Sequence, residues 1–247
     1  MPQRSRSFGA ISDHYDQFRP GPTDAAVDWL LAPGAREVVD VGAGTGALTR
    51  LLVARGLRVT AVEPDPRMRR TLSGRAPDAT ILDGTAEAIQ VADASQDAVL
   101  AHSAWHWVDP ARAIPEVARV LRPGGRLGVA WTRLDRDVDW VAELNAQLRL
   151  GLGGPGPGRR SHSFSVPGAG PFARPDGPHD VRFSRRFTRD QLLGLAGTYS
   201  AVIVLPAADR TDLLDRLRRD LDADPRLDSP DGIEVPLVSR CWRAVRH

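Results

Sequence analysis

The sequence predicts an α/β fold built on a doubly wound, mostly parallel seven-stranded sheet. The first observation is that strand-like and helix-like periodicities alternate from residue 37 to residue 132. The second is a glycine-rich loop that directly follows the first apolar run. The third is the length, because 247 residues with 42% hydrophobic and 26% charged side chains suit one globular domain with an elaboration. Alternating strands and helices place helices on both faces of a parallel sheet.

Five strands and the helices between them make up the central part. Apolar runs predict strands at 37–41, 57–62, 79–82, 97–101 and 127–131, and helical spacing predicts helices at 48–55 and 66–75. A further helix carries apolar residues at 114, 117, 118 and 121, but Pro115 interrupts the pattern that Asp109 and Pro110 open. We expect this helix to start near Ala113, and a kinked helix is the alternative.

Segments on both sides of this core complete the single domain. Residues 1–36 form an N-terminal cap with a helix from Thr23 to Leu31, residues 37–132 form the core, and residues 133–247 form the elaboration. In the elaboration we expect a helix at 137–150, a loop at 151–180, a strand at 181–187, a helix capped by Thr188, a helix around Leu213 and a strand at 233–245. The loop holds 14 glycine and proline residues, which predicts a lid or a disordered segment.

The composition excludes several classes of function. All 33 basic residues are arginine, so neither a Schiff-base lysine nor a complete P-loop is present. We attribute the missing lysine and the single Asn145 to codon bias. A net charge of +2 argues against a protein that coats nucleic acid or methylates RNA. One cysteine, Cys241, no apolar region in the first seven residues and no long apolar run predict a soluble, cytoplasmic protein.

A glycine loop with a distant acid predicts a binding site for an adenosine-containing ligand. The loop runs from Asp40 to Gly46 with the sequence DVGAGTG, and Glu63 ends the second strand 21 residues after Gly42. Glycine lets a ligand approach the amides at a helix N-terminus, and the acid is placed to accept hydrogen bonds from two ribose hydroxyls. The spacing also fits the relaxed dinucleotide fingerprint, so an NAD-dependent oxidoreductase is an alternative. An acid two residues before the first glycine favours a ligand with an ammonium group.

These residues resemble the class I S-adenosylmethionine-dependent methyltransferases, in the branch of type-11 small-molecule enzymes. Residues 38–46 resemble the first motif of the family, 62–64 its ribose acid, 84–87 its adenine-contacting stretch, 97–100 its fourth strand and 121–125 the turn before the fifth. The resemblance covers residues 37–132 and implies a Rossmann-like fold. It also implies S-adenosyl-L-methionine as the cofactor and a small molecule as the methyl acceptor.

The resemblance assigns roles to particular positions. It implies that Gly42 and Gly44 hold the methionine part, that Asp40 orders the loop and that Glu63 binds the ribose. Thr85 and Ala86 are cofactor-binding candidates in the adenine-contacting stretch, where many relatives have aspartate at the position of Thr85 and the Ala86 amide could contact the ring. The remaining cofactor-binding candidates are Tyr15, Arg19, Ala101 and His102, with Arg19 assigned to the cofactor carboxylate.

The stretch after the fourth strand is expected to carry the chemistry. His106 is the candidate general base, because a neutral imidazole accepts a proton near pH 7, and packing of the loop is the alternative. Trp105 and Tyr199 are the candidate substrate contacts, and Trp107 is assigned to packing. A metal site at His102 and His106 is not expected, because such a pair needs a helix.

We therefore expect methyl transfer to oxygen, in a hydroxyl or a carboxylate. A protein of this fold that binds the cofactor but catalyses another reaction, such as a cyclisation, is an alternative. Arg159, Arg160 and His162 are expected to be solvated, although they could attract a carboxylate or phosphate. A homodimer is left open.

Overall fold

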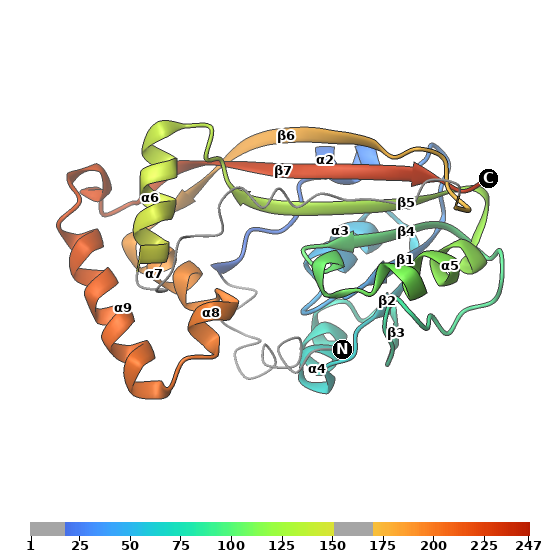
Figure 1. Ribbon diagram of the computed structural model, residues 1–247, viewed down its shortest axis with the longest axis horizontal. Coiled ribbons are helices and arrows are strands. Elements are labelled where there is room, and N and C mark those ends of the chain that lie inside the picture. Colours follow the sequence, from blue (N-terminus) through green and yellow to red (C-terminus); the bar gives the residue numbers. More distant parts are fainter. Residues whose placement is uncertain (1–17, 151–169) are drawn as a thin grey trace.

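One mixed sheet of seven strands extends through the whole protein in a computed structural model that describes residues 18–150 and 170–247 (Figure 1). The strand order is β3-β2-β1-β4-β5-β7-β6. Five strands pair in parallel, and these are β1 (Glu37–Val41), β2 (Arg58–Val62), β3 (Thr80–Leu82), β4 (Gln96–His102) and β5 (Leu121–Leu134). The last two, β6 (Asp176–Phe187) and β7 (Ile233–Val245), pair antiparallel. The predicted fold class is confirmed.

Helices cover both faces of the parallel part because its strands are apolar on both sides. Val38 packs with α2 (Asp24–Leu30) and α3 (Ala47–Ala54), whereas the next residue, Val39, packs in a separate cluster with α5 (Pro110–Val120). Successive residues of a strand point to opposite faces. The remaining helix of this part, α4 (Pro66–Arg75), is capped by the Asp65 side chain and buries Leu72.

A further apolar cluster joins three helices, α6 (Asp139–Leu150), α7 (Arg189–Gly197) and α9 (Ala207–Asp222), to the long strands. Together with the short helix α8 (Ser200–Ile203) they form a helical lobe at the end of the molecule opposite α5 (Figure 1). A capping box between Thr188 and Gln191 starts α7 as predicted. Strands β5 and β7 are long enough to run from the parallel part of the sheet to this helical lobe. One continuous sheet therefore connects the lobe to the parallel strands.

Several boundaries differ from those expected from the sequence, and β5 is the longest extension, at Leu121–Leu134 where a strand at 127–131 was expected. Helix α5 starts at Pro110 rather than near Ala113, because the Asp109 carboxylate accepts the Ala111 N–H at 3.0 Å and Pro110 occupies the first helical position. Pro115 therefore lies inside the helix. Strand β6 starts at Asp176, within the segment expected to be a loop. It tolerates Pro178 because it is an edge strand, and its register shifts between Asp176 and His179.

The sequence predicts a lid or a disordered segment at residues 151–180. Of these, residues 151–169 lie outside the part of the chain that the structure describes. None of the helices in the described ranges is long and apolar enough to cross a membrane.

Candidate active site

The glycine loop links the end of β1 to the start of α3 in a conformation that side chains disfavour. Gly42, Gly44 and Gly46 have φ angles of +67°, +59° and +93°. The Gly42 N–H donates to the Val62 carbonyl at 2.8 Å, which ties the loop to the end of β2. A Cβ atom at Gly42 would lie 2.5 Å from the Ala104 Cβ, so only glycine fits between the loop and the segment after β4.

Glu63 supports this loop from the end of β2. Its Oε2 accepts the Gly44 N–H at 2.9 Å, and its Oε1 accepts the Asp65 N–H at 2.9 Å. The side chain is buried, and burial raises the Glu63 pKa while these two hydrogen bonds oppose that rise. Each carboxylate oxygen has a second lone pair. Glu63 can therefore hold the loop and still accept hydrogen bonds from ligand hydroxyls.

Asp40 is a second carboxyl group beneath the loop and is only 1% exposed. The Thr49 hydroxyl donates to it at 2.6 Å. Burial raises the Asp40 pKa to about 7, the Thr49 hydrogen bond opposes the rise, and the nearby Glu63 charge adds to it. A cation that binds next to Asp40 would favour its ionised form. The site is therefore suited to a positively charged ligand.

His102 ends β4 in a polar chain of side chains. Its Nε2 lies 3.0 Å from the Thr132 hydroxyl, which lies 2.7 Å from the Ser239 hydroxyl. Burial, and then the positive charge of Arg19, lowers the His102 pKa to about 4, so the ring is neutral near pH 7. The next residue, Ser103, has a φ of +55°, and this left-handed turn redirects the chain away from the strand.

His106 lies in the short 3₁₀ helix η3 (Trp105–Trp107) and its side chain contacts Trp131. The Trp131 Nε1–H donates to His106 Nδ1 at 3.2 Å. Because the indole nitrogen can only donate, Nδ1 is the acceptor and the neutral ring carries its proton on Nε2. In this form Nε2–H is a donor, and proton uptake by the ring would need Nδ1. The assignment of His106 as general base stays a prediction, and the Trp131 contact limits which nitrogen could serve.

A cavity of about 480 Å³ brings most of the predicted residues together. This volume is within the range typical of small-molecule sites. The predicted residues that line it are Arg19, Asp40, Gly42, Gly44, Glu63, Thr85, Ala86, His102, His106 and Tyr199.

Three predicted residues do not lie on the cavity wall that the structure describes. Tyr15 is outside the described residues. Ala101 and Trp105 are 1% and 5% exposed and belong to the core cluster around α5. Trp107, which was assigned to packing, lines the cavity, whereas Trp105, the candidate substrate contact, does not. Residues two apart in a 3₁₀ helix point in different directions, so only one of the two can face the cavity.

Polar residues of β5, of the loop after it and of α6 line the same cavity, although the sequence did not predict them as site residues. Arg133 and Arg136 come from the end of β5 and the loop that follows it, and Asn145 and Arg149 come from α6. The one available signal was the spacing of Asn145 and Arg149, because residues four apart share a helix face.

Tyr199 closes the cavity from the turn between α7 and α8. The guanidinium carbons of Arg19 and Arg149 lie 5.1 Å and 5.5 Å from the centre of its ring. Arg19 also donates to the Thr198 hydroxyl at 2.9 Å and to the Thr198 carbonyl at 3.1 Å. Burial raises the Tyr199 pKa, so the phenol is protonated near pH 7. Arg19 therefore attaches the segment before α2 to the helical lobe.

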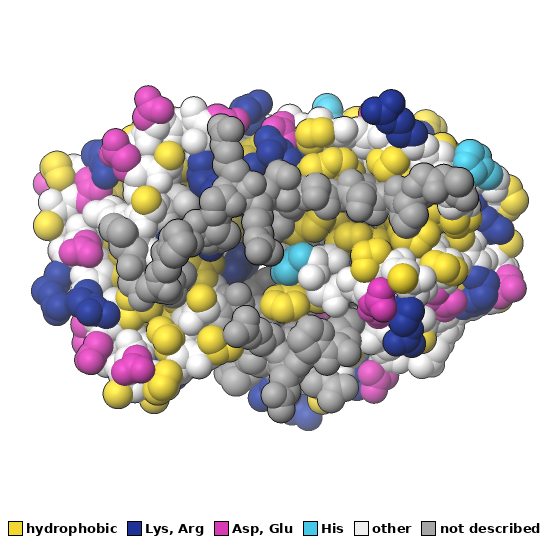
Figure 2. All heavy atoms as spheres, in the orientation of Figure 1, with side chains coloured by type: hydrophobic (Ala, Val, Ile, Leu, Met, Phe, Trp, Pro, Cys, Tyr) yellow, Lys and Arg dark blue, Asp and Glu magenta, His cyan; other side chains and the backbone are white. Residues whose placement is uncertain are grey.

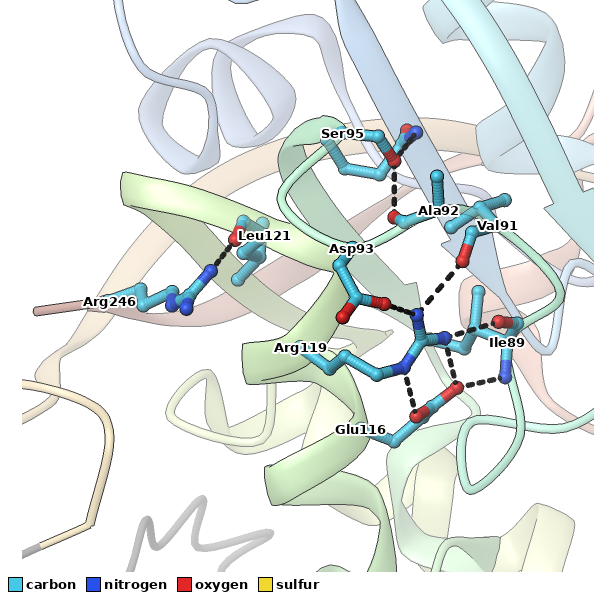
Figure 3. A network of polar contacts seen from close by, with 10 residues as sticks. Ile89, Val91, Ala92, Asp93, Ser95, Glu116, Arg119, Leu121 and Arg246 are labelled. Atoms are coloured by element: carbon cyan, nitrogen blue, oxygen red, sulfur yellow. Dashed lines mark hydrogen bonds and ion pairs between the residues drawn. The ribbon is translucent and has the colours of Figure 1, made fainter.

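A network around Arg119 fixes the loop between β3 and β4, which carries the Thr85 wall of the cavity (Figure 3). Arg119 donates to the main-chain oxygens of Ile89 and Val91 at 2.8 Å and 3.0 Å and pairs with Asp93. Glu116, one turn earlier on α5, accepts from Arg119 at 2.8 Å and from the Ile89 N–H at 2.6 Å. The loop is thus held to α5 by side chains.

Within residues 18–150 and 170–247, no group of three or more histidine, cysteine, aspartate or glutamate side chains is arranged to hold a metal ion.

Comparison with known proteins agrees with this geometry. Residues 39–129 match a family model described as a methyltransferase domain. An uncharacterized methyltransferase of Mycobacterium tuberculosis is 45% identical over 240 residues, which cover 97% of this chain and 96% of the relative. A malonyl-[acyl-carrier protein] O-methyltransferase of Methylococcus capsulatus is 38% identical over 164 residues, which cover 57% of this chain and 58% of that protein.

A solved structure shows the same fold. A protein of Anaeromyxobacter dehalogenans described as a type II methyltransferase superposes with a TM-score of 0.68 and 29% identity, covering 93% of this chain and 98% of that one. The glycine loop and the acid at the end of β2 indicate the same family as the relative that is 45% identical along 97% of the sequence. The chain belongs to the class I S-adenosylmethionine-dependent methyltransferases.

Proposed function

We propose that the protein binds S-adenosyl-L-methionine and transfers its methyl group to an oxygen of a small molecule, in a hydroxyl or a carboxylate. The observation that carries the proposal is one cavity with two chemically different sides. Asp40, Glu63 and glycines at the ends of β1 and β2 line the part next to the parallel strands, and Tyr199 and arginines of β5 and α6 line the part next to the helical lobe (Figure 1).

The residues on the carboxylate side fit the cofactor. Glu63 would accept from the ribose hydroxyls, and the amides of the Gly42–Gly44 stretch would hold the methionine part. Asp40, with its raised pKa, would become ionised next to a cationic ammonium or sulfonium group. The cofactor supplies an electrophilic methyl group on its sulfonium, so the protein has to align the acceptor and exclude water.

The acceptor side determines which oxygen is methylated. If the acceptor is a hydroxyl, its proton needs a base, and His106 is the candidate. If the acceptor is a carboxylate, no proton has to be removed, and the Nε2–H of His106 can donate to it instead. The name of the Methylococcus capsulatus relative specifies transfer to oxygen, which supports an O-methyltransferase.

Charge and cysteine chemistry support a small acceptor in a reducing compartment. Acidic and basic side chains are interspersed around the rim of the face in Figure 2, as expected from a net charge of +2. A nucleic-acid substrate would favour one positive surface. We infer a cytoplasmic location because the single cysteine, Cys241, is buried and cannot form a disulfide within the chain.

Calorimetric titration with S-adenosylmethionine, its demethylated product and NAD tests cofactor choice. We expect the first two ligands to bind, and we expect Glu63→Gln to raise their Kd by about tenfold or more. Glu234→Gln, at an exposed position of β7, is the control and should leave the Kd unchanged. Binding of NAD alone would contradict the proposal. Transfer of isotope-labelled methyl from the cofactor to a small molecule, detected by mass spectrometry, tests the reaction, because binding without any methylated product would leave a non-methylating role.

A further inference from the structure

Three arginines on the acceptor side of the cavity have no acidic partner among the described residues. These are Arg133, Arg136 and Arg149, and no described carboxylate lies within ion-pair distance of any of them. Elsewhere in the structure arginines such as Arg226 and Arg240 hold carboxylates at 2.6 Å. Positive charge that is not held in a direct ion pair therefore gathers at this side of the cavity.

Arg133 is the most constrained of the three. Its side chain is half-buried, and its Nε is fully buried without a hydrogen-bond partner in the described structure. Burial, followed by the charges of Arg240 and Arg136, lowers its pKa. The charges of Asp180 and Asp137 oppose this lowering only in part, and Asp180 makes its direct ion pair with Arg240, at 2.7 Å and 2.6 Å. A buried donor without a partner is unfavourable unless a ligand satisfies it.

Acids near the other two arginines are also engaged elsewhere. Asp135 and Asp137 flank Arg136 in the sequence, but both bind Arg182, at 3.0 Å and 2.9 Å. Glu143, on the same helix as Arg149, binds Arg226 at 2.6 Å.

Arg149 shares its face of α6 with a second polar group that reaches the cavity. Asn145 precedes it by one helical turn, and both residues line the cavity. An amide and a guanidinium one turn apart can donate to the same oxyanion. Tyr199, which lies beside Arg149, adds a phenol that burial keeps protonated.

We propose that Arg133, Arg136 and Arg149 bind an anionic group of the methyl acceptor, so that the substrate is a small oxyanion. This inference rests on the proposed methyltransferase function and names its substrate class. Guanidinium groups match planar carboxylates in two-pronged geometry, and a carboxylate or a phosphate would both satisfy the free donors. The group held by the arginines positions the acceptor, and the oxygen that is methylated points toward the carboxylate side of the cavity.

Calorimetry on protein saturated with S-adenosylhomocysteine tests the inference, with malonate, citrate and inorganic phosphate as probes at low salt. We expect at least one of these anions to bind, and Arg133→Gln and Arg149→Gln each to raise its Kd by about tenfold or more. Arg218→Gln, an exposed arginine of α9 paired with Asp190, is the matched control and should leave the Kd unchanged. Preference for malonate and citrate over phosphate would identify a carboxylate, and the reverse a phosphate.

The affinity for S-adenosylhomocysteine separates the possible failures. Both variants should bind it as the wild-type protein does and unfold cooperatively, which shows that the fold is intact. Anions that compete with S-adenosylhomocysteine would mean that the arginines bind the cofactor carboxylate. This result would overturn the inference and leave the proposed methyltransferase function standing. Equal anion affinity in wild type and variants, or no anion binding to the wild-type complex, would also overturn it. A wild-type protein that does not bind S-adenosylhomocysteine would overturn the proposed function as well.

Discussion

Replacing Asp40 by asparagine should remove a pH dependence that this buried carboxyl imposes on the stability of the ligand-free protein. Burial raises its pKa from 3.8 to about 7. Below pH 3.8 Asp40 carries its proton in both the folded and the unfolded chain, so its burial costs no ionisation energy and the protein has its full stability. As the pH rises toward and through about 7, the unfolded chain ionises first, so the folded state loses stability.

The magnitude follows from the size of the pKa change. At about 1.4 kcal/mol for each tenfold change in proton affinity, Asp40 removes up to about 4 kcal/mol from the free energy of unfolding between pH 4 and pH 8. The amide of Asp40→Asn has nearly the same shape but no charge, so the variant should lose this dependence and exceed the wild type in stability above pH 7.

Urea denaturation of the ligand-free protein between pH 4 and pH 8 measures this difference. Asp209→Asn, at an exposed position of α9, serves as the control and should follow the wild-type curve. Parallel curves for wild type and Asp40→Asn would contradict a raised Asp40 pKa in the folded protein. A second readout is available because a cationic cofactor favours ionised Asp40. Calorimetry near pH 6.5 in buffers of different ionisation enthalpy should show proton release on cofactor binding in the wild type and little in Asp40→Asn.

Three further substitutions test other parts of the site. Gly42→Ala should destabilise the protein by about 1–3 kcal/mol in urea denaturation and weaken cofactor binding, since its methyl would lie 2.5 Å from another carbon. Gly56→Ala shares a positive φ without that clash and should leave cofactor binding intact. Arg119→Met should cost about 2 kcal/mol and speed hydrogen exchange in residues 89–95, and unchanged exchange would contradict its anchoring role. His106→Ala should lower turnover about 10²-fold with cofactor binding retained, and Trp131→Phe should cause a smaller loss. Unchanged turnover in both would remove His106 from the chemistry.

The cofactor side could be predicted from the sequence because its signals are local. The loop from Asp40 to Gly46 and the acid Glu63 each directly follow an apolar strand, and parallel pairing of β1 and β2 brings them together. Strand and helix periods are also local, which explains why most elements were predicted. The start of α5 was wrong because the capping strength of Asp109 outweighed the effect of Pro115.

The acceptor side could not be predicted because distant parts of the chain create it. Arg133 reaches the cavity through the antiparallel pairing of β5 with β7, where it lies opposite Val238. Arg149 depends on how α6 packs against α7 and α9, and Trp107 depends on the direction of a three-residue helix. The spacing of Asn145 and Arg149 indicates a shared helix face but not what that face contacts, and no local pattern separates Trp107 from Trp105.

A crystal structure with S-adenosylhomocysteine would show directly how the cavity is divided between cofactor and acceptor. We expect the ribose hydroxyls on the Glu63 carboxylate, the homocysteine part along the Gly42–Gly44 stretch, and no contact between the ligand and Arg133 or Arg149. An adenosine that lies among those arginines, or a ribose that does not touch Glu63, would contradict this division.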